Sequence, residues 1–321
     1  MDPHSSRKAV WIALAANLSI FLIKALGAWY SGSAVMFSEA LHSMADMFNS
    51  IFLLVGLYLS IRPADDEHPF GYGKEVYFWS FMASIFMLGI TSMGSIYRGY
   101  ETLLNPHSIN DLGLTLTLLG LTILFESYAV YAAMNGVVKD VGIAAKGFGI
   151  IPQALQNIGK VSNPAVKFIF FEDLIALTGV ILAALALVLV WLTGSIVFDA
   201  AISIFIGVLL GIMALILAKQ NKGMIIGQAA SDSLEQTIGD TALDVYMVSD
   251  VHDLKTMYVG PQDLLVNMEI EVPPDKTAEE IDDIVDDVEE RIRLKVPSVK
   301  HISIEVTPDD QIQDWKKAHA K

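Results

Sequence analysis

The chain has 321 residues, of which 53% are hydrophobic and 18% charged, and its mean hydropathy is +0.49. Soluble globular domains carry about 25% charged residues, so this composition excludes a single soluble domain and indicates a membrane protein. The formal net charge is −15 and there is no cysteine, which argues against nucleic-acid binding and excludes disulfides and thiolate metal sites.

The charge is concentrated toward the C-terminal end. Residues 1–220 contain 14 acidic and 11 basic residues, whereas residues 221–321 contain 22 acidic and 10 basic residues. This contrast predicts a nearly neutral transmembrane domain over 1–220, an acidic soluble domain over 221–310 and a flexible tail over 311–321.

Six stretches hold the roughly 20 apolar residues that a helix needs to cross a bilayer. They cover about 9–30, 34–61, 76–103, 112–138, 166–193 and 196–220. The first is too long for a cleavable signal peptide. With six spans, nine basic residues fall on one side: Arg7, Lys8, Arg62, Lys74, Lys139, Lys146, Lys160, Lys167 and Lys219. We therefore expect both termini to be cytoplasmic, and the lack of a transit peptide favours a prokaryotic inner membrane.

Outside the spans, the 139–165 segment is expected to be a long Gly-rich loop, and the residues after 221 show an α/β pattern. A helix is predicted over 231–243, strands over 253–258 and 264–272, a helix over 277–294 and a strand over 301–306. Thr277 and Glu280 have the spacing of a capping box at the start of the second helix. The order of these elements resembles a small ferredoxin-like layer.

Ionisable residues inside the spans are costly at bilayer depth and therefore mark candidate functional groups. His42 and Asp46 are four residues apart in the second span, so both side chains lie on one helix face and can reach one divalent cation. Glu172 and Asp173 lie in the fifth span, but adjacent helical residues point about 100° apart, so only one of them is expected to face the ion directly. An interhelical His–Asp hydrogen bond is the structural alternative.

Other polar residues in the spans favour structural roles. Glu126 in the fourth span fits a counter-ion for Lys24 in the first span better than a proton-coupling group. Asp111 and Asp199 fit carboxylates at the membrane interface that stabilise the start of their own helices. Asn17 and Asn49 fit interhelical hydrogen-bond donors.

Residues 38–46, 65–75 and 251–255 together resemble segments of the cation diffusion facilitators, and Phe171-Glu172-Asp173 with the pattern over 261–306 resembles the branch that contains mitochondrial zinc transporter nine. Residues 38–46, Ser-Glu-Ala-Leu-His-Ser-Met-Ala-Asp, are similar to the His-x-x-x-Asp metal motif of the family's second span. Residues 65–75 resemble the loop that follows it, and residues 251–255 resemble the first strand of the family's cytoplasmic domain. The resemblance implies six spans followed by a ferredoxin-like domain, and a homodimer.

The family pattern also assigns candidate ligands and shows departures. It implies a transport site of His42, Asp46 and Asp173, with Glu172 as a possible fourth ligand, because Ile169 stands where the fifth span usually has His. Asp65 and His68 are weaker candidates in the loop, where Tyr72 replaces a frequent metal-binding His. In the C-terminal domain His252 matches a ligand, but the remaining ligands are replaced by Met268, Glu305 and Thr307, so zinc binding there is expected to be poor.

The function that the resemblance implies is proton-coupled export of a divalent cation, with His42 and Asp46 exchanging metal for protons and no bound cofactor. Zinc is favoured, and manganese, iron and cobalt stay open because carboxylates outnumber imidazoles. The expected partners are a second copy of the chain, the cation, protons and the lipid bilayer, with no nucleic acid. Two alternatives are a non-transporting scaffold or metal-sensing regulator with the same fold, and a membrane metallohydrolase, which lacks the usual ligand set with a separate base.

Overall fold

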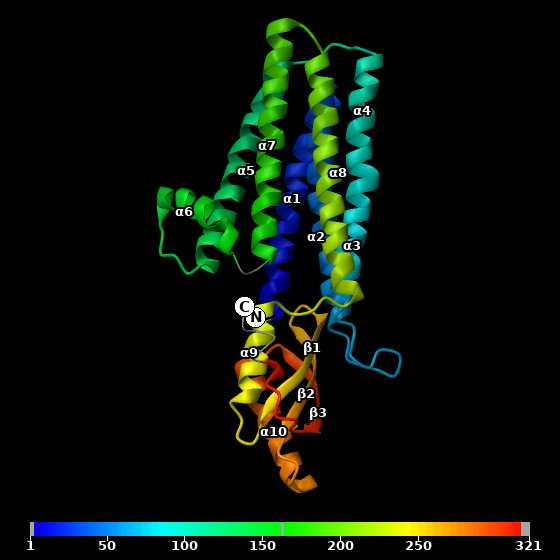
Figure 1. Cartoon of the computed structure of the whole chain (residues 1–321). Coiled ribbons are helices and arrows are strands. Elements are labelled where there is room, and N and C mark those ends of the chain that lie inside the picture. The colour runs from blue at the N-terminus through cyan, green and yellow to red at the C-terminus, as the bar shows by residue number, and fades with distance from the viewer. Residues whose placement is uncertain (1–2, 162–163, 316–321) are drawn as a thin grey trace. The chain divides into compact units, whose positions relative to one another are not determined.

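The computed structural model describes residues 3–161 and 164–315 and contains two compact units (Figure 1). One unit consists of residues 1–54 and 82–218, and the other of residues 55–81 and 219–321. The first unit contains the greater part of the long helices, and the second contains the α/β domain together with the neighbouring helix ends and one loop.

Long helices account for most of the N-terminal two thirds of the chain. They are α1 (Pro3–Ser31), α2 (Ala34–Ser60), α3 (Glu75–Phe86), α4 (Met93–Leu104), α5 (Leu112–Asp140), α7 (Pro164–Thr193) and α8 (Val197–Ile226). Among the described residues, five helical segments are long and apolar enough to cross a membrane. These are 34–60, 75–104, 112–140, 169–193 and 197–226. The first expected span lies in α1, which is helical but not one of these five, so a sixth span stays a prediction.

The third expected span is one continuous helical segment that contains a π-helical stretch. This stretch, η1 (Met87–Ser92), joins α3 to α4, and such bulges often occur at functional sites. Ser92 donates its hydroxyl to the Gly207 carbonyl of α8 at 2.7 Å. A Cβ at Gly207 would lie 2.9 Å from the Ser92 carbonyl oxygen, so the absence of a side chain permits this close approach of the two helices.

The predicted loop over 139–165 is wrong in part, because the segment contains a short helix. The short helix is α6 (Ile150–Asn157), and it is preceded by the 3-10 turn η2 (Gly147–Gly149) and followed by the 3-10 turn η3 (Ile158–Lys160). Ile150 and Ala154 of α6 are buried in one hydrophobic cluster with Val137 of α5 and Phe170 of α7. The apolar positions of α6, four residues apart, thus cover the neighbouring ends of α5 and α7 (Figure 1).

The C-terminal domain has the predicted order of elements. It contains α9 (Asp232–Leu243), β1 (Asp250–Gly260), β2 (Asp263–Val272), α10 (Ala278–Lys295) and β3 (Val299–Pro308). The sheet order is β1-β2-β3, with β1 antiparallel and β3 parallel to β2. The parallel pair requires a crossover, which α10 supplies. The core contains Ile238 of α9, Ile270 of β2 and Val288 of α10.

Local sequence signals define the start of α10. Thr277 accepts a hydrogen bond from the Glu280 backbone N–H at 3.3 Å, and the Glu280 carboxylate accepts one from the Thr277 backbone N–H at 2.9 Å. The capping box expected from these two residues is present.

The flexible tail expected over 311–321 is wrong for its described part, which ends at Trp315. Trp315 is 7% exposed and belongs to the core of the C-terminal domain. Its indole N–H donates to the Asp240 carboxylate at 3.0 Å. A Cβ at Gly239 would lie 2.0 Å from the indole ring, so the ring packs directly on the α9 backbone.

Candidate metal centre

The position of α2 is fixed at its first turn by a carboxylate of α8. Asp199 accepts hydrogen bonds from the Ser33 hydroxyl at 2.5 Å, the Ala34 N–H at 2.7 Å and the Val35 N–H at 3.2 Å. These bonds satisfy backbone donors that a helix start leaves unpaired. The expectation of an interfacial carboxylate serving its own helix is wrong, because Asp199 is fully buried and serves α2.

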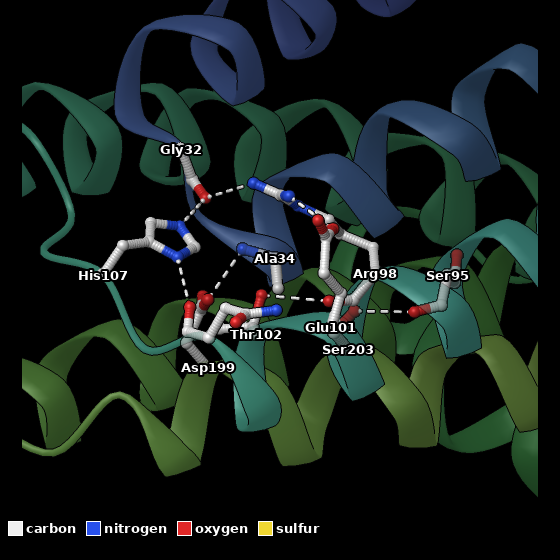
Figure 2. A network of polar contacts seen from close by, with 10 residues as sticks. Gly32, Ala34, Ser95, Arg98, Glu101, Thr102, His107, Asp199 and Ser203 are labelled. Atoms are coloured by element: carbon white, nitrogen blue, oxygen red, sulfur yellow. Dashed lines mark hydrogen bonds and ion pairs between the residues drawn. The ribbon is translucent and has the colours of Figure 1, made fainter.

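The turn before α2 is held by two further side chains (Figure 2). Arg98 of α4 donates to the Gly32 carbonyl at 3.2 Å, and Nε2 of His107 lies 2.9 Å from the same oxygen. Arg98 also pairs with Glu101 at 2.7 Å. Because Gly32 has a φ of +72°, the tight turn suits a residue without a Cβ.

The third and fourth turns of α2 present the two predicted ligands on one face. His42 Nε2 lies 3.8 Å from Asp46 Oδ2. His42 is 5% exposed, and neither of its ring nitrogens has a hydrogen-bond partner within the described part of the chain. Buried polar groups are almost always paired, so the two unsatisfied nitrogens make the His42 imidazole a candidate ligand for a bound ion.

Glu172 and Asp173 of α7 complete the wall of the cavity that His42 and Asp46 line. The cavity has a volume of about 210 Å³, and its other polar lining residues are Asn17, Ser43, Asn49, Ser50 and Glu126. Both adjacent acids line the cavity, and which of them faces the ion directly stays a prediction.

A fully buried ion pair stands beside this cavity. Lys24 Nζ of α1 lies 3.0 Å from Glu39 Oε2 of α2 and 3.4 Å from Glu126 Oε1 of α5. The pairing of Lys24 with Glu126 is present as predicted, but Glu39 is the nearer partner. Glu126 therefore both binds Lys24 and lines the metal-ligand cavity.

The balance of charges suits a divalent cation. Four carboxylates line the cavity, and Lys24 offsets one of them at most. His42 adds a nitrogen ligand with no other described partner. Nitrogen and oxygen ligands around a polar cavity match the preferences of zinc and related metals.

The loop candidates Asp65 and His68 are brought together with each other but with no third ligand in the described chain. Asp65 Oδ1 lies 3.7 Å from His68 Nδ1, and both side chains are about half exposed. The Tyr72 hydroxyl donates to Asp65 at 2.7 Å and lowers the pKa of that carboxyl. The Asp65 oxygens thus organise the loop.

His252 belongs to the C-terminal domain and has two neighbours that the sequence pattern did not reveal. Its Nδ1 lies 2.9 Å from Asp314 Oδ2 and 4.0 Å from Glu271 Oε1. The hydrogen bond to Asp314 raises the pKa of the imidazole. Burial raises the pKa of the Glu271 carboxyl. Met268 is instead buried in the hydrophobic core.

Two protein-family models cover almost the whole chain. The cation efflux transmembrane domain matches residues 10–226, and the cytoplasmic domain of cation efflux proteins matches residues 230–309. The chain belongs to the cation efflux family. As predicted, this member is a multi-pass membrane protein with a helical transmembrane domain followed by a small α/β domain.

Individual relatives of this cation efflux protein come from plants, animals and bacteria. Metal tolerance protein C4 of Arabidopsis thaliana is 31% identical over 84% of the chain, and a mitochondrial proton-coupled zinc antiporter, SLC30A9 of Xenopus laevis, is 27% identical over 93%. The chain spans only 58% and 59% of the length of these two relatives. The cation-efflux pump FieF of Pectobacterium atrosepticum is 24% identical, with 97% of the chain and 98% of the pump covered.

The sequence did not indicate three residues that contact the buried lysine or His252 in this cation efflux protein: Glu39, Glu271 and Asp314. Glu39 pairs with Lys24 across two helices, and nothing local in the sequence reports that contact. Ile270 and Glu271 are successive residues of β2 and are both buried, so both faces of the strand are covered here, which the sequence pattern alone did not indicate.

Proposed function

We propose that the protein exports divalent cations across a membrane in exchange for protons, with zinc as the leading substrate. The observation that carries this proposal is the buried His42, whose two ring nitrogens have no hydrogen-bond partner among the described residues and which lines a cavity with Asp46, Glu172 and Asp173. Family membership supports transport over enzymatic activity. The names of the plant and animal relatives, a metal tolerance protein and a zinc antiporter, support the cation and the proton coupling.

In the proposed cycle the cation binds between α2 and α7. A neutral His42 nitrogen and the ionised carboxylates of Asp46 and Asp173 are its direct ligands, with Glu172 as a further ligand or a nearby charge. Ligands must be deprotonated to bind metal, so protons arriving from the opposite side compete with the cation. Protonation of His42 and Asp46 removes the nitrogen lone pair and one negative charge, which releases the ion.

The proposed ligands are also compatible with metals other than zinc. One imidazole with up to three carboxylates is a harder set than two imidazoles with two carboxylates. Zinc, iron and cobalt accept such mixed ligands, and manganese favours the oxygen-rich end of the range. The name of the antiporter relative supports zinc as the first ion to test.

The remaining parts of the proposal concern assembly and orientation. The C-terminal domain, over about residues 221–310, makes the dimer contact, as the family model for this domain supports. Basic residues on one side of the spans support cytoplasmic positions for both termini. A transmembrane domain over 1–220 with six spans, including α1, belongs to the same proposal, and a prokaryotic inner membrane stays a prediction.

The test is metal uptake into proteoliposomes that hold the purified full chain, driven by a pH gradient of opposite direction. We expect zinc uptake by the wild type and none by Asp46→Asn, because the carboxamide keeps the volume but removes an anionic ligand. Asp111→Asn is the matched control: Asp111 caps α5 through the Leu114 N–H at 3.0 Å, and Asn caps equally well.

Two outcomes would contradict the proposal. Normal transport by a folded Asp46→Asn variant would place the site elsewhere. The absence of uptake of zinc, manganese, iron and cobalt by the wild type would favour the scaffold or metal-sensing alternative.

A further inference from the structure

A second group of metal-ligating side chains gathers in the C-terminal domain. His252 comes from β1, Glu271 from β2 and Asp314 from the segment that follows β3. One ligand atom of each residue lies within 4.8 Å of the other two. The β1–β2 register shifts between Val251 and Asp253, which leaves His252 without a strand partner. Such bulges re-aim a side chain, and this one directs the imidazole to the two carboxylates.

An unsatisfied atom in this group points independently to a ligand. Glu271 is 3% exposed, and its Oε2 has no hydrogen-bond partner within residues 3–161 and 164–315. A buried carboxylate oxygen without a partner is costly. A cation bound between Glu271 and its neighbours would remove this cost.

The carboxylates around Glu271 have no lysine or arginine partner in the ion pairs of the described residues. Asp309 and Asp310 form a second acidic group with Glu271. In the described chain the ion pairs of Lys255, Lys276, Arg291 and Arg293 are all with other carboxylates. The cationic partner within reach of Glu271 and Asp314 is His252, which is 47% exposed.

We propose that His252, Glu271 and Asp314 form a second divalent-cation site within a single copy of the C-terminal domain, separate from the transport cavity. One nitrogen and two carboxylate oxygens make a set of the type that binds zinc with water as the fourth ligand. The two new ligands do not lie at the positions of Met268, Glu305 and Thr307, so this site differs from the one implied by the family pattern.

The distances between the ligand atoms are close to those of an occupied site. Tetrahedral zinc with bonds of about 2.0–2.2 Å holds its ligand atoms roughly 3.3–3.6 Å apart. The His252–Asp314 distance of 2.9 Å must lengthen slightly, and the His252–Glu271 distance of 4.0 Å must shorten.

Metal binding at this site would attach the end of the described chain to the sheet. Asp314 directly precedes Trp315, whose ring packs on the α9 backbone at Gly239. Its backbone N–H also donates to the Asp250 carboxylate. An ion held jointly by Asp314 and the two strands would therefore fix the 309–315 segment and, through Trp315, the position of α9.

The experiment is calorimetric titration of zinc into the purified full chain in detergent. The background variant Asp46→Asn/Asp173→Asn removes ligands of the transport cavity, and we expect it to bind one zinc per chain. Adding His252→Ala, Glu271→Gln or Asp314→Asn should weaken that binding at least tenfold. Asp286→Asn, an exposed charge change on α10, is the matched control and should bind as the background does.

Folding and specificity are checked in the same samples. Circular dichroism spectra of His252→Ala should equal those of the background, because the side chain is half exposed. Zinc should raise the melting temperature of the background but not that of the Asp314→Asn variant. Absence of zinc binding by the folded background, or equal binding by all three ligand variants, would overturn the second site.

The stoichiometry separates this inference from the proposed function. If the transport ligands were assigned wrongly, the background would keep two zinc ions, and the tail substitutions would still remove one. If the tail site did not exist, the wild type would bind only the ion held by the membrane cavity, and His252→Ala would leave that number unchanged.

Discussion

Replacement of Lys24 by methionine should destabilise the transmembrane domain severely. Lys24 is fully buried and its Nζ contacts Glu39 at 3.0 Å and Glu126 at 3.4 Å. Methionine retains the length and the apolar stem of lysine but removes the charge. Two carboxylates, of which Glu39 is 1% exposed, would then lose their shared cation.

The magnitude follows from the two distances. At an effective dielectric constant of about 20, unit charges 3.0 and 3.4 Å apart attract each other by roughly 5 kcal/mol per pair. Burial of the charges offsets most of this attraction, and removing one partner of a buried pair costs about 3–5 kcal/mol. We expect Lys24→Met to lose about that much. The triple variant Lys24→Met/Glu39→Gln/Glu126→Gln should recover most of the loss, because it leaves no unpaired charge.

Reversible unfolding by SDS in mixed micelles, followed by circular dichroism, measures this difference. Lys139→Met, at the exposed last turn of α5, is the control and should change the free energy of unfolding little. If Lys24→Met were as stable as the wild type, or the triple variant no more stable than Lys24→Met, the three residues would not act as one ion-pair group.

Three further predictions concern the ligands, the capping box and the helix contact. In a His252→Ala background, Asp173→Ala should abolish zinc binding by the transport cavity, whereas Glu172→Ala should weaken that binding about tenfold, or about 1.4 kcal/mol, or change the preferred ion. Titration of both variants with zinc, manganese and cobalt tests this, and the reverse order would make Glu172 the direct ligand. The Thr277 backbone N–H lowers the pKa of the Glu280 carboxyl below its usual value of 4.5. The ionised carboxylate therefore stabilises the start of α10 fully above the usual value, and this contribution is lost as the pH falls through the lowered pKa. Hydrogen exchange across α10 should therefore be faster in Glu280→Gln than in the wild type at pH 7, with the gap closing in acid; a gap independent of pH would refute the assignment. Gly207→Val should cost about 1–3 kcal/mol of unfolding free energy by overpacking, and an unchanged SDS unfolding curve would show that α4 and α8 can separate without loss.

The parts of the site that depend on local spacing could be predicted from the sequence. His42 and Asp46 share a face because they are four residues apart in one helix, and the capping box of α10 requires only Thr277 and Glu280. The presence of Glu172 and Asp173 at one cavity could not be decided from helix geometry alone. Their common position depends on how α7 is packed, which the sequence of α7 does not state.

Contacts between distant segments account for most of what the sequence did not reveal. Asp199 looks like a cap for its own helix, but its carboxylate bonds to Ala34, 165 residues earlier in the chain. The 311–315 segment reads as polar and mobile, yet Trp315 fills a space over Gly239 that exists only in the folded domain. Short apolar spacing in α6 was also too weak a signal to distinguish a helix from a Gly-rich loop.

The carboxylate of Asp199 fixes one end of α2, so a tilt of the helix about this end would displace the residues further along it. Its three hydrogen bonds hold the first turn in place, while His42 and Asp46 lie about 12 and 18 Å further along the helix at 1.5 Å per residue. A tilt of about 10° about this pivot would carry the two side chains through roughly 2–3 Å at that radius. Metal–ligand distances tolerate only about 0.2 Å, so a small rotation at one end suffices to assemble or dismantle coordination at the other.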